Sequence, residues 1–72
     1  MHCIIRIVVH AHGCDVGIIH RSLSQSEAIY KAFELNSLHK AKGIIYLSSA
    51  DTDDSIRETV AYFYKIHSAV AG

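Results

Sequence analysis

The sequence predicts a small α+β domain of element order β-β-α-β-α, in which a three-stranded antiparallel sheet carries two helices on one face. Three observations support this class. Short runs rich in β-branched residues alternate with polar punctuation in the N-terminal third. Two later segments repeat apolar residues at helical spacing, each behind a capping-box sequence. The chain has 72 residues, 50% of them hydrophobic, so we expect one domain over residues 1–72.

The first two strands are predicted over residues 4–11 and 16–21, joined as a β-hairpin. Gly13 accepts the positive φ that the first central residue of a two-residue turn requires. A turn at this glycine pairs Val9 with Ile18. A slip of one residue would exchange the two faces of the hairpin.

The first helix is predicted over residues 25–38. Ser24 and Glu27 have capping-box spacing, in which both side chains bond backbone amides at the helix start. Asn36 falls on the apolar face, where a hydrogen-bonded polar residue is expected. Gly43 is expected to end the helix, after basic residues that suit its C-terminus: His39, Lys40 and Lys42. The predicted apolar face consists of Ala28, Ile29, Ala32, Phe33 and Leu35.

A third strand over residues 44–47 and a second helix over residues 55–70 complete the chain. Ser55 and Glu58 again have capping-box spacing. The three nearby aspartates are better explained by the helix start than by a calcium loop, because the loop's glycine and distal glutamate are missing. The apolar stripe of this helix is predicted to be Ile56, Val60, Phe63, His67 and Val70.

The connections of these elements predict the sheet order 2-1-3. A right-handed crossover makes the third strand parallel to the second and therefore antiparallel to the first. Placing the third strand beside the first puts the most apolar strand at the centre of the sheet. With both helices on one face, the opposite face is expected to remain uncovered.

This uncovered face is the predicted partner-binding surface. It mixes aliphatic, histidine and arginine side chains, a composition common in protein interfaces. An ordinary solvated sheet face is the alternative. The predicted binding residues are Arg6, Val8, His10, His12, Ile19 and Arg21.

The function expected from these features is that of a non-enzymatic protein-interaction module, a homodimeric regulator or inhibitor of a macromolecular partner. A chain this short buries little surface by itself, and a second copy can supply the missing burial. Inhibitors carried by phages and other mobile elements are small binders of this kind. We expect a protein partner, no cofactor and no catalytic residue, because the nucleophile and base that Cys14 and the nearby histidines suggest lack an orienting third residue.

Two alternatives remain open. His10 and His12 have the i,i+2 spacing that points both imidazoles to one side of a strand, and Cys14 follows, so a transition-metal site is the first alternative. A nucleic-acid-binding dimer using Arg6 and Arg21 is the second. The zero net charge and the lack of a Lys/Arg cluster make nucleic acid the less expected partner.

The expected location is the cytoplasm, without membrane insertion. The apolar run near the N-terminus is interrupted by Arg6 and lacks a signal-peptide cleavage site. It is also much shorter than the roughly 20 residues that span a bilayer. Cys3 and Cys14 are too few for a secreted disulfide scaffold and are expected to be reduced thiols.

Overall fold

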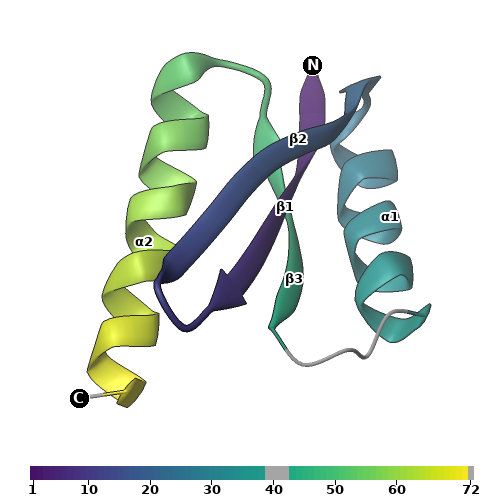
Figure 1. The fold of residues 1–72 in the computed structure, drawn as a ribbon. Helices are drawn as coiled ribbons and strands as arrows, with labels where there is room; N and C mark the ends of the chain where they lie inside the picture. Colours follow the sequence, from purple (N-terminus) through teal and green to yellow (C-terminus); the bar gives the residue numbers. More distant parts are fainter. Residues whose placement is uncertain (39–42, 72) are drawn as a thin grey trace.

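The computed structural model describes residues 1–38 and 43–71, with side chains as far as Ile66. It confirms the predicted element order and the strand order β2-β1-β3, with β1 antiparallel to both neighbours. The first helix has the predicted bounds, whereas every strand is longer than predicted and the second helix begins earlier. The elements are β1 (His2–His10), β2 (Gly13–Leu23), α1 (Gln25–Leu38), β3 (Ile44–Ala50) and α2 (Asp53–Ala71) (Figure 1).

The two helices pack on opposite faces of the sheet, so the prediction that both lie on one face is wrong (Figure 1). Ile4 and Ile5 are neighbours in β1 and both are 0% exposed. Ile4 packs with Ala28 and Ala32 of α1, whereas Ile5 lies in a separate cluster that packs against Ile56 of α2. Because successive strand side chains point to opposite faces, a central strand that buries both needs a layer on each side.

The turn of the hairpin lies earlier than predicted. Residues 11–12 form it, whereas the prediction placed it at Gly13. The backbone N–H of His12 donates a hydrogen bond to Nδ1 of His10 at 3.3 Å, which stabilises this turn.

The strand register changes with the turn. Val9 lies opposite Cys14 and Ile7 lies opposite Val16, so the predicted pairing of Val9 with Ile18 is wrong. From Gly13 to Ile18 the displacement is an even number of residues, so these side chains keep the face predicted for them. The regular pairing of β1 with β2 ends at Ile18, beyond which the register shifts as in a β-bulge.

Helix α1 begins with the predicted capping box. The Glu27 N–H donates to Oγ of Ser24, and the Ser24 N–H donates to Oε1 of Glu27, both at 3.1 Å. These bonds to Ser24 lower the pKa of the Glu27 carboxyl below its ordinary value, because they stabilise the charged form.

Helix α1 contacts the sheet through its small side chains. Ala28 and Ala32 are buried and Leu35 is half-buried. Ile29 and Phe33 are 54% and 71% exposed, so the prediction that both belong to the core is wrong. The alanines allow the helix to approach the sheet closely, and the bulky residues beside them remain at its rim.

Helix α2 is capped by Thr52 rather than by the predicted Ser55. Oγ1 of Thr52 accepts a hydrogen bond from the Ser55 N–H at 3.2 Å, and its carbonyl accepts one from the Ile56 N–H at 3.0 Å. The predicted stripe of Ile56, Val60 and Phe63 packs against the sheet as expected.

Several predicted features lie outside the described residues. They are the basic helix end, with His39, Lys40 and Lys42, and the side chains of His67 and Val70. Among the helices that the structure describes, none is long and apolar enough to span a bilayer.

Candidate functional site

The predicted partner-binding residues do not form one open surface. Helix α1 covers the part of the face around Ile4, where Ile19 packs against the same cluster, and Val8 is half-buried. Four of the predicted residues are exposed: Arg6, His10, His12 and Arg21. Of the six predicted residues, these four are the ones open to a partner.

Arg21 lies away from the hairpin turn and is paired with a carboxylate. Its guanidinium Nη1 lies 3.8 Å from Oδ1 of Asp51, whose backbone N–H donates to the carbonyl of Met1. Arg21 therefore lies near the N-terminal end of β1, and an adjacent carboxylate partly balances its charge. Arg6 lies farther along β1, opposite Gly17, so the two arginines of the nucleic-acid hypothesis are separated.

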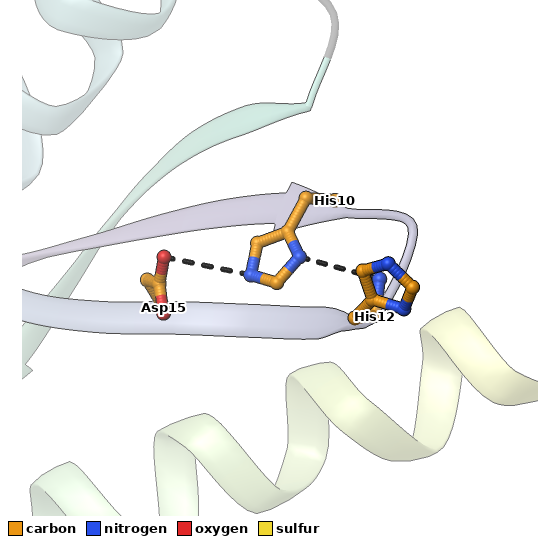
Figure 2. Close-up of polar contacts among 3 residues, drawn as sticks. All are labelled: His10, His12 and Asp15. Carbon is orange, nitrogen blue, oxygen red and sulfur yellow. Dashed lines mark hydrogen bonds and ion pairs between the residues drawn. The ribbon is translucent and has the colours of Figure 1, made fainter.

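His10 makes two polar contacts at the tip of the hairpin. Its Nδ1 accepts the His12 N–H, and its Nε2 lies 3.4 Å from Oδ2 of Asp15. Figure 2 shows the imidazole of His10 between these two partners. Since Nδ1 accepts a hydrogen bond, the ring proton of neutral His10 is placed on Nε2, facing the carboxylate. Neither ring nitrogen offers a free lone pair in this arrangement.

The residues of the metal alternative are not brought together. His10 lies on the face of the hairpin with Asp15, whereas Cys14 packs into the cluster on the α2 side of the sheet. Within residues 1–38 and 43–71, no three His, Cys, Asp or Glu side chains gather in a way that could hold a metal ion. A metal at His10 would first have to displace the His12 N–H or the Asp15 carboxylate.

Cys14 lies beside Tyr64 of α2. Burial raises the pKa of the Tyr64 hydroxyl, and the neighbouring Cys14 and Asp15 raise it further. Because successive side chains of β2 alternate between faces, the thiol and the imidazole of His10 point to opposite sides of the hairpin. They do not form a nucleophile and base pair.

Helix α1 carries an exposed apolar surface that the sequence analysis missed. We call Ile29, Tyr30 and Phe33 the α1 apolar surface; they are 54%, 69% and 71% exposed. Ile29 and Phe33 are four residues apart and therefore adjacent on the helix. The sequence does indicate this surface. Viewed down the helix axis, the apolar residues span an arc that includes both Ala28 and Tyr30 and is wider than one small sheet can cover.

The described part of the molecule contains no pocket that could enclose a small molecule. Its candidate functional features are surfaces, chiefly the α1 apolar surface and the open end of the hairpin. No family model, curated protein or solved structure matches this chain. Its function must be inferred from its own residues.

Proposed function

We propose that the protein is a non-enzymatic interaction module that acts as a homodimer in the cytoplasm and regulates or inhibits a protein partner. The observation that carries this proposal is the α1 apolar surface. Aromatic residues are enriched in the cores of protein interfaces, and a few such anchors supply most of the binding free energy.

The geometry of this surface favours docking of the helix into a groove of the partner. Ile29 and Phe33 have the i,i+4 spacing of anchors that enter an apolar groove, and Tyr30 combines an apolar ring with a hydroxyl that a polar rim can bond. The matching partner is therefore a protein with an apolar groove. The exposed hairpin residues Arg6 and His12 are a second candidate contact.

Both cysteines are free thiols, which supports a reducing compartment. Cys3 is buried in the core beneath α2, and Cys14 is half-buried at its edge. Neither is bridged in the fold.

The test compares proteins retained from the source cells by the wild-type chain and by matched variants. We expect Ile29→Gln with Phe33→Gln to lose a partner that the wild type binds in a fixed stoichiometry after both are purified. Tyr62→Gln is the control, because Tyr62 is 67% exposed on α2 and comparable to Phe33. Glutamine is a good helix former, so the helices should persist.

Retention of the same proteins by the wild type and the α1 double variant would contradict a role for the α1 apolar surface. Arg6→Ala and His12→Ala then test the hairpin surface in the same way. A partner that needs Arg6 but neither Ile29 nor Phe33 would move the docking site to the hairpin.

A further inference from the structure

The two edges of the sheet differ in how well they are protected from pairing with a further strand. At the β3 edge, the side chain of Asn36 bonds both backbone groups of Tyr46. Among the described elements, none lies beyond β2 in the sheet. An uncovered edge strand presents a row of backbone groups that another strand can pair with.

The ladder identifies which backbone groups of β2 point outward. The N–H of Val9 donates to the carbonyl of Gly43, toward β3, at 2.6 Å. Because the hydrogen-bonding direction alternates along a strand, Val9 does not bond its β2 partner Cys14. Cys14, Val16 and Ile18 therefore direct their N–H and C=O groups away from β1, whereas Asp15 and Gly17 direct theirs toward it.

Few of the features that normally protect an edge occur in this stretch, and the bulge of β2 lies beyond it. The regular part of β2, from Gly13 to Ile18, contains no proline or lysine, and Asp15 is its one charged residue. Val16 is 43% exposed, although its side chain lies on the apolar α2 face of the sheet. A Cβ added at Gly17 would meet no atom within 4 Å, so the neighbouring space is open.

We propose that two copies of the chain pair through the β2 edge, antiparallel, about a two-fold axis at Val16. Val16 lies opposite Val16 of the partner subunit, and Cys14 lies opposite Ile18 of the partner subunit. The product is a six-stranded antiparallel sheet with both α1 helices on one face and both α2 helices on the other. This inference rests on the homodimer of the proposed function and specifies its interface.

The register follows from the outward groups and from charge. Only the register centred on Val16 pairs all of Cys14, Val16 and Ile18 with outward groups of the second copy. A register centred on Gly17 leaves the backbone groups of Cys14 without a partner in the regular part of the second β2 strand. A register centred on Asp15 places two carboxylates directly opposite each other, which is unfavourable. The register at Val16 instead sets Asp15 against Gly17.

The side chains on the α2 face also favour this pairing. Cys14 and Ile18 already pack at the margin of the cluster beneath α2. Directly opposite residues of an antiparallel pair share a face, so the three apolar side chains of each copy meet there. The pairing extends the α2-side core from one subunit into the next and covers Val16.

The test uses opposite charges at the symmetry axis. Sedimentation velocity should show the wild type and Val16→Thr as dimers, because threonine keeps the β-branched shape and the backbone groups. Val16→Lys and Val16→Glu should each be monomeric, since like charges meet across the axis. An equimolar mixture of these two variants should recover the dimer. Val16 is at the surface, so circular dichroism should show each variant folded.

Each contrary outcome has a separate meaning. A wild type that remains monomeric at all concentrations overturns both the edge pairing and the homodimer of the proposed function. A wild-type dimer that Val16→Lys and Val16→Glu leave intact overturns the edge pairing alone. Monomeric variants that do not recover on mixing overturn the register at Val16.

Amide hydrogen exchange of the wild type provides a readout without mutation. The amides of Cys14, Val16 and Ile18 should exchange more slowly as protein concentration rises, because dimerisation pairs them. Those of Asp15 and Gly17 should be protected at every concentration, since β1 pairs them. Exchange at Val16 that is independent of concentration in a dimeric sample contradicts the pairing.

Discussion

The side chain of Asn36 hydrogen-bonds both backbone groups of Tyr46. Nδ2 of Asn36 donates to the Tyr46 carbonyl, and the Tyr46 N–H donates to Oδ1 of Asn36, both at 2.9 Å. An asparagine amide has the same donor and acceptor as a peptide group. Asn36 thus takes the place of a neighbouring strand at this point of the β3 edge and fastens α1 to the sheet.

Asn36→Ala should lower the free energy of unfolding by about 1–3 kcal/mol, because it removes two hydrogen bonds to backbone groups of a buried residue. Ser37→Ala, at an exposed neighbouring position of α1, is the control for loss of a polar side chain. Chemical denaturation measures both variants. Equal stability of the two variants would show that the contact with Tyr46 contributes nothing.

Gly43→Ala should destabilise the fold by about 1–3 kcal/mol. Gly43 has φ of 86°, and a Cβ there would lie 2.8 Å from the carbonyl oxygen of Val9. Gly17→Ala is the matched control, because that Cβ meets no atom within 4 Å, and its stability should change by no more than about 0.5 kcal/mol. Thermal or urea unfolding distinguishes the two. Similar effects at both glycines would contradict the steric argument.

The capping box should make stability depend on pH through Glu27. Its bonds to Ser24 lower its folded-state pKa, so the carboxylate stabilises the fold above the unfolded-state pKa of about 4.3. This contribution is lost as the pH falls through the lowered folded-state value. Urea denaturation should find the wild type more stable than Glu27→Gln at neutral pH, with the difference vanishing in acid. A difference that stays constant with pH would contradict this role of the carboxylate.

Local chemistry explains which parts of the fold the sequence predicts. The capping box at Ser24 and Glu27 is confirmed because both partners lie within one turn of chain. The order of the elements and the central place of β1 are also confirmed. Both could be predicted because the strand segments and the lengths of their connections follow directly from the sequence. The hairpin turn lies at residues 11–12 instead of Gly13, and the bond from the His12 N–H to the ring of His10 is a contact that the preference of glycine for turns does not predict.

The placement of the helices required packing information that periodicity does not provide. The adjacent apolar residues Ile4 and Ile5 indicate that both faces of β1 are covered, yet the prediction put both helices on one face. Ala32 and Phe33 of α1 are both apolar, so periodicity alone does not say which of them is buried. The close approach of the helix to the sheet places the smaller Ala32 in the core and leaves Phe33 exposed. As a result, the main candidate site lies on the exposed side of α1 and not on the sheet face predicted from the sequence.

The two thiols should differ sharply in reactivity. Cys3 is 0% exposed, and burial raises its pKa, so the reactive thiolate is suppressed; Cys14 is half-buried near the hairpin turn. At protein concentrations low enough to keep the chain monomeric, a thiol reagent with peptide mapping by mass spectrometry should label Cys14 first and Cys3 only when the sheet opens. Cys14→Ser should abolish the fast phase, and Cys3→Ala should leave it in place. Labelling of both thiols at one rate in the folded protein would mean that Cys3 is not enclosed beneath α2.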